Sequence, residues 1–267
     1  MSFDLFSPDE EVGARGGTGV PLAERMRPRT LEEVAGQEHL TGPDRLLGQI
    51  ARGTTLPSII FWGPPGSAKT TQARLLARAR RAQFVATSAV SAGVKEIRDA
   101  VRRAETARRA GQGTILFLDE IHRFNKSQQD ALLPHVESGL LVLMGATTEN
   151  PSFEVNAALL SRCRVVVLHP LTRDALLSLL EAAVSDSDRG LGAVPPQLDT
   201  GVRAALVNGA DGDARRLLNS LEVAVDMARS QAGDQCTVTA EHVKQALQVA
   251  ALRYDRAGEE HFNLISA

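Results

Sequence analysis

A chain of 267 residues with 43% hydrophobic and 23% charged side chains has the composition of an ordinary globular protein, with one large domain or two smaller ones. Its net charge of −2 gives no global attraction to nucleic acid, so contact with DNA must come from a local patch. Two cysteines, Cys163 and Cys236, are too few for a disulfide framework, and no apolar run reaches the roughly 18 residues of a membrane span. We expect a cytoplasmic protein with reduced cysteines and without a signal peptide.

Short apolar runs indicate a parallel sheet in the first part of the chain. Residues 7–20 are rich in Gly, Pro and acidic side chains, which predicts a flexible segment over residues 1–20. From there, strand-length runs alternate with helical stretches such as Thr71–Arg81 and Val94–Arg109. The expected strands, each read as buried on both faces, are Ile59–Trp62, Phe84–Thr87, Thr114–Leu118, Leu140–Gly145 and Arg164–Leu168. This alternation predicts a five-stranded parallel α/β domain over residues 21–170.

After Pro170 the apolar residues recur at helical spacing. Thr172 is expected to cap a first helix, and others are expected over Gln197–Asn208, after Asp213 and from Thr239. Cys236–Val238 is the one strand candidate there. The pattern predicts a small helical domain over residues 171–267.

A glycine-rich turn follows the first expected strand. Residues 63–70 read GPPGSAKT, and such a turn before a helix directs backbone N–H groups at a phosphate. Lys69 is expected to reach the β- and γ-phosphates of ATP, and the Thr70 hydroxyl to ligate Mg²⁺. The competing interpretation is a chance Gly/Pro turn, which the strand, the Lys-Thr pair and the helix together disfavour. The expected nucleotide-binding residues are Gly63, Pro64, Pro65, Gly66, Ser67, Ala68, Lys69, Thr70 and Thr71.

The strand Thr114–Leu118 ends in two adjacent carboxylates, Asp119 and Glu120. Ligands of open α/β sheets bind at the carboxyl ends of the strands. Asp119 is therefore expected to hold Mg²⁺ through water, and Glu120 to act as the general base on the attacking water. A solvated loop is the ordinary alternative, but the pair follows the phosphate loop by about 50 residues, which favours the catalytic interpretation.

The next expected strand leads into a polar segment, Gly145–Asn150. Thr147, Thr148 or Asn150 can hydrogen-bond the attacking water or the γ-phosphate. A turn with capping residues explains the same side chains equally well.

Two arginines are further candidates. Arg162 precedes the last strand and suits a finger offered to a neighbouring subunit's γ-phosphate; a surface arginine at a helix end is the alternative. Arg215 follows Asp213, which fits a helix N-terminus, and can reach ATP from the second domain unless it is simply solvated.

With these segments, the chain resembles the clamp-loader clade of AAA+ ATPases. The resemblance implies Walker A at residues 63–70 and Walker B at residues 115–120. It implies sensor 1 within Thr147–Asn150, with Thr148 as our choice, a trans-acting arginine finger at Arg162, and sensor 2 at Arg215.

Within that clade the chain is most similar to the RarA/MgsA family of replication-associated recombination ATPases. The resemblance covers residues 21–267 almost without gaps. It is carried by residues 26–28 (MRP), 36–37 (GQ), 91–98 (SAGVKEIR), 117–129 (FLDEIHRFNKSQQ) and 145–153 (GATTENPSF).

This family resemblance implies partners as well as chemistry. The segment around Arg25–Pro28 would lie beside the adenine, with Arg25 and Pro28 as the binding residues. Members are DNA-stimulated ATPases that act at stalled forks and gaps, contact single-strand-binding protein and form homo-tetramers through a C-terminal domain. It implies DNA that is single-stranded, gapped or forked, and a nucleoid-associated protein in the cytoplasm.

The chain departs from the family at two places. Ala68 replaces a glycine of Walker A, and family members continue well past Ala267, so we expect a chain without the oligomerisation domain. Separately, Phe3–Phe6 resembles the bacterial sliding-clamp-binding peptide, although a chance Leu-Phe pair near a terminus explains it equally well.

Three other classes of protein are rivals. Asp119–His122 spells the DExH box of superfamily 2 helicases, but a small helical second domain argues against two RecA-like domains. An inactive, ATP-gated clamp-loader scaffold usually lacks the base or the loop lysine, whereas Glu120 and Lys69 are present. A RuvB-type motor adds a winged-helix domain, for which the chain is too short.

Overall fold

The computed structural model describes residues 19–53, 55–232 and 236–249, and these form two compact units. The α/β unit comprises Arg27–Leu176 and Ala210–Arg215. The helical unit comprises the described residues up to Met26, Leu177–Gly209 and those from Arg216 onward. The sequence-based boundaries at residues 20 and 170 stay a prediction. Two short segments cross them: the residues from 21 to Met26 belong to the helical unit, and Ala210–Arg215 belong to the α/β unit. Phe3–Phe6 and the chain end at Ala267 lie outside the described residues.

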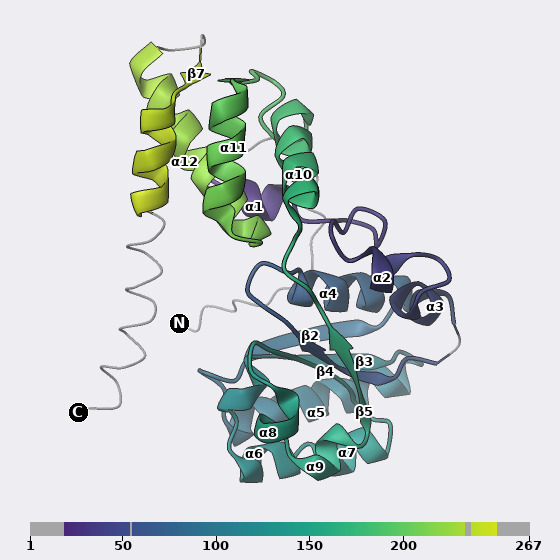
Figure 1. Cartoon of the computed structure of the whole chain (residues 1–267). Coiled ribbons are helices and arrows are strands. Elements are labelled where there is room, and N and C mark those ends of the chain that lie inside the picture. The colour runs from purple at the N-terminus through teal and green to yellow at the C-terminus, as the bar shows by residue number, and fades with distance from the viewer. Residues whose placement is uncertain (1–18, 54, 233–235, 250–267) are drawn as a thin grey trace, which may run out of the picture. The chain divides into compact units, whose positions relative to one another are not determined.

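The α/β unit contains one five-stranded sheet, in which every neighbouring pair of strands is parallel (Figure 1). The strands are β1 (Ser58–Trp62), β2 (Gln83–Ser88), β3 (Thr114–Asp119), β4 (Val142–Thr147) and β5 (Cys163–Val167), in the spatial order β2-β3-β4-β1-β5. The expected fold class is therefore confirmed. The central strands β3, β4 and β1 end side by side, so their C-terminal residues share one edge of the sheet.

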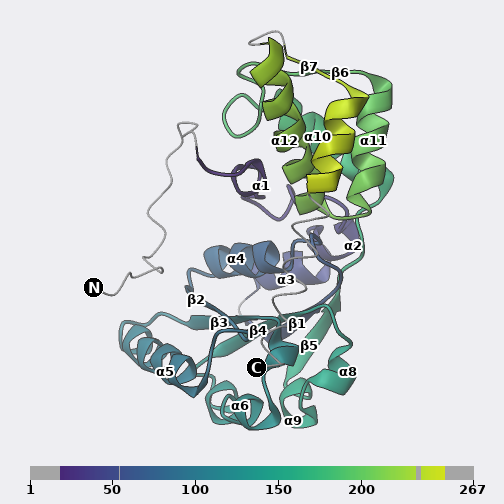
Figure 2. The same ribbon diagram turned by 90° about the vertical axis from the view of Figure 1, so that its left-hand side faces the viewer.

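Helices cover both faces of this sheet (Figure 2). On one face, α3 (Leu46–Arg52) and α4 (Lys69–Ala79) pack Leu47 and Leu76 against Phe61 and Phe117. On the other face lies α5 (Val94–Arg109), which has the bounds expected from the sequence. The same face carries five shorter elements: η1 (Ile121–Arg123), α6 (Lys126–Asp130), α7 (Leu133–Glu137), α8 (Pro151–Glu154) and α9 (Ala157–Leu160). Because successive strand residues alternate between these faces, a buried strand is apolar throughout.

The expectation that all five strands are buried on both faces is wrong for the two edges. β2 is half-buried along its whole length, and β5 exposes Arg164, Val165 and Val167. Each edge strand has one neighbour in the sheet, so its outer side is not covered as the central strands are. The β4 strand also begins and ends two residues later than expected, which places Thr147 inside the sheet.

The helical unit contains α1 (Leu22–Arg25), most of α11 (Thr200–Ala210) and of α12 (Ala214–Ala232), and a helix over residues 240–249. The last residue of α11 and the first residues of α12 belong to the α/β unit. The helix α10 (Arg173–Ser185) begins in the α/β unit, which also contains α2 (Glu38–Thr41), and continues into the helical unit. The Thr172 hydroxyl accepts from Ala175 N–H, as a cap should. The core is formed by buried residues such as Leu180, Leu206, Leu217, Leu221 and Val225.

The helix expected over Gln197–Asn208 starts later than predicted. Gln197–Leu198 forms the short strand β6, which pairs in parallel with β7 (Thr237–Val238), and Asp199 Oδ1 accepts from Val202 N–H at the start of α11. None of the described helices is long and apolar enough to cross a membrane.

Candidate nucleotide-binding site

Residues 63–70 form a loop between β1 and α4 that is closed by its own hydrogen bonds. Lys69 Nζ donates to the carbonyl oxygens of Gly63 (2.7 Å) and Pro64 (2.8 Å), and Ser67 Oγ donates to the Pro64 oxygen (2.8 Å). The Gly63 N–H donates to the carbonyl of Thr147 at the end of β4 (3.2 Å). The loop is thereby attached to the neighbouring strand, and its lysine is only 9% exposed.

Two residues of the loop adopt left-handed backbone conformations. Gly66 has φ +67°, and a Cβ atom there would lie 1.9 Å from Asp213 Oδ1, so only glycine allows this segment to approach. Ala68 has φ 72° and ψ 25°, a conformation that costs an L-residue about 1–2 kcal/mol. That cost is the physical reason why glycine is usual in this slot. The structure accommodates alanine there directly before the first residue of α4.

Opposite charges surround the lysine. Burial lowers the pKa of Lys69, while the carboxylates of Glu120, Asp119 and, more weakly, Asp213 act to raise it, and Arg215 acts to lower it. The structure thus brings three other sequence-predicted residues, Asp119, Glu120 and Arg215, within electrostatic reach of Lys69. A buried cation near an acidic pair has the charges that would suit a polyphosphate and its metal ion.

Glu120 follows β3 with φ 55° and ψ 45°, an uncommon conformation for a residue with a side chain. Its Oε2 lies 3.3 Å from Nε2 of His122, and Nδ1 of His122 lies 3.0 Å from the Thr147 hydroxyl. The sequence interpretation did not include His122 in the site, since no pattern in the sequence reveals a side-chain contact across two strands.

The segment after β4 uses two of its polar side chains in structural contacts. The buried Thr147 hydroxyl accepts from Glu149 N–H (3.0 Å), and Asn150 Oδ1 accepts from Ser152 N–H (3.0 Å) as the cap of α8. These two are the capping and turn contacts of the ordinary interpretation. Thr148 is half-buried between them, so the choice of Thr148 as the sensor stays a prediction.

Arg162 lies at the surface after α9, with its side chain 40% exposed. Its guanidinium donates to the Ala158 carbonyl (2.7 Å) and pairs with Glu137 of α7 (2.5 Å). The side chain is therefore anchored within its own chain but accessible from outside.

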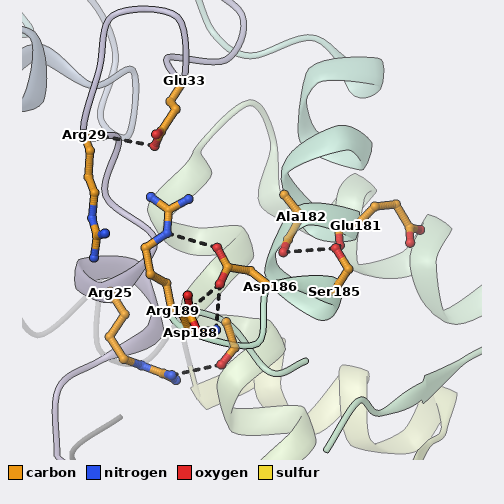
Figure 3. A network of polar contacts seen from close by, with 10 residues as sticks. Arg25, Arg29, Glu33, Glu181, Ala182, Ser185, Asp186, Asp188 and Arg189 are labelled. Atoms are coloured by element: carbon orange, nitrogen blue, oxygen red, sulfur yellow. Dashed lines mark hydrogen bonds and ion pairs between the residues drawn. The ribbon is translucent and has the colours of Figure 1, made fainter. Parts of the chain in front are cut away.

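The two residues expected beside the adenine belong to different units. Arg25 belongs to the helical unit, where it donates to the Gly190 carbonyl (3.0 Å) and lies 3.6 Å from Glu222. Figure 3 shows Arg25 directed toward the loop that the Asp186–Arg189 ion pair closes. Pro28 is half-buried in the α/β unit, and its neighbour Arg27, within the same predicted segment, donates to the Thr71 hydroxyl (3.1 Å). The adenine contact stays a prediction.

Comparison with known proteins places the chain in a family. Residues 59–171 match the "ATPase family associated with various cellular activities (AAA)", and residues 192–267 match the "AAA C-terminal domain". Replication-associated recombination protein A of Coxiella burnetii is 51% identical over 248 residues, which cover 93% of this chain and 56% of that protein. The protein of that name from Escherichia coli K12 is 46% identical, over 92% of this chain and 55% of that protein. The chain belongs to the RarA family of AAA+ ATPases.

The chain spans about half the length of these RarA relatives. A solved structure of the Thermotoga maritima RuvB Holliday junction branch migration motor has a TM-score of 0.65 to this chain at 22% identity, covering 84% of this chain and 73% of that one. At that identity the likeness shows a shared fold alone.

The residues around the loop have the ligand chemistry that magnesium requires. Mg²⁺ prefers oxygen ligands and is commonly held by one or two protein oxygens together with water and phosphates. The Thr70 hydroxyl at the start of α4 and the Asp119 carboxylate at the end of β3 offer such oxygens. Among the described residues, no group of three or more His, Cys, Asp or Glu side chains is arranged so that it could hold a metal ion, so an all-protein metal cage is not found in this part of the chain.

Proposed function

We propose that this chain binds ATP with Mg²⁺ and hydrolyses it to ADP and phosphate, and that DNA stimulates the reaction. The observation that carries the proposal is the group of charges around Lys69 of the phosphate loop. Asp119 and Glu120 come from the end of β3, and Arg215 comes from the start of α12. A structural lysine would not need to face two carboxylates and an arginine while it is fixed by two carbonyls.

Each residue has one role in this proposal. Lys69 and the loop N–H groups bind the phosphates, while Thr70 and Asp119 would hold Mg²⁺, which would supply positive charge to the phosphates. Glu120 accepts the proton of the attacking water, and Thr148 hydrogen-bonds that water or the γ-phosphate. Arg215 contributes positive charge from the start of α12.

Arg162 is the residue that another subunit uses. Its exposure suits a finger inserted into a neighbour's site, where such an arginine stabilises the charge of the transition state. Its bond to Glu137 must then be released on assembly. An exposed pair of this kind is worth about 0–1 kcal/mol, so release is inexpensive. We infer that the active form is a homo-oligomer.

The biological setting is proposed from the relatives, whose name describes replication-associated recombination. We propose action at stalled forks or gaps in cytoplasmic, nucleoid-associated DNA, with single-stranded, gapped or forked DNA and single-strand-binding protein as partners. Phe3–Phe6, outside the described residues, is proposed as a contact to the sliding clamp.

An ATPase assay with defined DNA tests both parts of the proposal. Phosphate release is measured with no DNA and with single-stranded, gapped, forked or fully duplex DNA, using Lys69→Ala as the inactive control. We expect turnover that depends on Lys69 and rises with the open DNA structures. Equal rates for all DNAs would contradict DNA stimulation, and ATP binding without turnover under every condition would favour an ATP-gated scaffold.

A further inference from the structure

A continuous line of polar contacts leads from Glu120 to the end of the neighbouring strand. Glu120 Oε2 contacts His122 Nε2 at 3.3 Å, His122 Nδ1 contacts the Thr147 hydroxyl at 3.0 Å, and that hydroxyl lies 3.2 Å from the Glu149 carbonyl. The imidazole is 8% exposed and Thr147 is fully buried, so little water competes for these bonds. The proposed base is thus connected to β4 through a histidine.

The donors and acceptors of this line can be assigned from chemistry. A carboxylate only accepts, so Nε2 of His122 must carry a proton to bond Glu120. Glu149 N–H already uses one lone pair of the Thr147 oxygen. With a neutral ring, the Thr147 hydroxyl donates to Nδ1; with a protonated ring, the hydroxyl accepts from Nδ1 and donates to the Glu149 carbonyl. Either way, Nε2–H remains directed at Glu120.

The backbone around His122 holds the ring in place. Arg123 N–H donates to the Glu120 carbonyl (2.8 Å), which closes the turn that the left-handed conformation of Glu120 begins. Ile121 is fully buried and packs where Gly145 of β4 has no side chain: a Cβ on Gly145 would lie 2.9 Å from Ile121 Cδ1. The short helix η1 is therefore fixed against β4 one residue before His122.

We propose that His122 is a positioning residue for ATP hydrolysis. Its Nε2–H holds Oε2 of Glu120, which orients the carboxylate so that the other oxygen can take the proton of the attacking water. Thr147 in turn orients the imidazole. The inference rests on the proposed function, because it gives a role to His122 only if Glu120 is the base.

The test compares variants at one protein concentration with saturating ATP and Mg²⁺. His122→Ala is expected to lower kcat by about 10- to 100-fold, the range for one hydrogen bond to a charged group, while the Kd for ATP stays unchanged. His122→Gln should recover kcat to within about threefold of wild type, because its amide nitrogen can donate to Glu120 and its oxygen can accept from Thr147. His135→Ala, on α7, is the matched control and should leave both quantities unchanged.

A double-mutant cycle tests the line of contacts itself. Thr147→Val removes the hydroxyl at nearly constant volume and should lower kcat less than His122→Ala does, whereas Thr147→Ser should retain activity. In the His122→Ala background, Thr147→Val should have almost no further effect, since the two residues act through one contact. Additive losses would overturn the proposal.

Two other results would also overturn it. Unchanged kcat in His122→Ala would show that Glu120 is oriented without the histidine. A loss that His122→Gln does not recover, together with a lowered melting temperature, would show that His122 is only structural. A failure of the underlying function is distinguishable, because wild type and Glu120→Gln would then hydrolyse ATP equally slowly.

Discussion

Replacing Gly66 by alanine tests how the phosphate loop and the Asp213 segment fit together. The left-handed backbone at residue 66 costs alanine about 1–2 kcal/mol. The new Cβ would also lie 1.9 Å from Asp213 Oδ1 and 2.9 Å from Asp213 Cα, and such overpacking typically costs about 1–3 kcal/mol. The native loop conformation should therefore lose about 2–5 kcal/mol in Gly66→Ala.

Titration with a fluorescent ATP analogue and thermal melting together measure this cost. If all of it falls on the nucleotide-binding conformation, the Kd rises by about 30- to 4,000-fold; if it falls on the fold, Tm drops by about 4–20 °C. In an Asp213→Ala background the same substitution should cost less, because the nearest two atoms are gone. Ala68→Gly is the converse control, since it relieves a left-handed alanine and should change affinity by no more than about 1 kcal/mol. A Gly66→Ala chain with wild-type Kd and Tm would refute the geometry of this contact.

Three further outcomes are expected. Mixing an Arg162→Ala chain with a Lys69→Ala chain should partly restore ATPase activity, because each supplies what the other lacks; no recovery at any concentration would exclude a trans finger. Glu137→Gln should raise the specific ATPase activity by up to about fivefold, since it frees Arg162 from an exposed ion pair; an unchanged rate would mean that the pair does not compete with assembly. Burial raises the pKa of the Cys163 thiol to about 11, so its thiolate is scarce at pH 8. Iodoacetamide should therefore alkylate Cys163 roughly 100-fold more slowly in the folded than in the unfolded chain, as followed by mass spectrometry. Equal rates would place the thiol at the surface.

The fold was predictable because its central strands obey one simple rule. β1, β3 and β4 are buried on both faces, so they appear in the sequence as short apolar runs, and the polar residues that end them meet at one edge. That rule placed Glu120 correctly at the end of β3, and together with the glycine-rich turn it placed Lys69 at the start of α4. It was less useful for β5, whose exposed valines look like buried ones in the sequence.

What the sequence could not reveal depends on contacts between distant residues. The two-residue strand β6 exists only because β7 lies beside it, so helical periodicity extended too far toward Gln197. The position of His122 depends on a left-handed turn at Glu120, for which a glutamate gives no signal. The closeness of Gly66 to Asp213, about 150 residues later in the chain, is likewise a property of the folded α/β unit.

Single-turnover hydrolysis of ATP by Glu120→Gln shows whether Glu120 is the base of this site. An amide keeps the shape of the side chain but cannot accept the proton, so ATP affinity should match wild type while the rate of phosphate formation falls by at least about 100-fold. Glu154→Gln, an exposed glutamate of α8, is the matched control and should hydrolyse at the wild-type rate. A Glu120→Gln chain that binds ATP and hydrolyses it at a near-normal rate would contradict the assignment of the base and the account built on it.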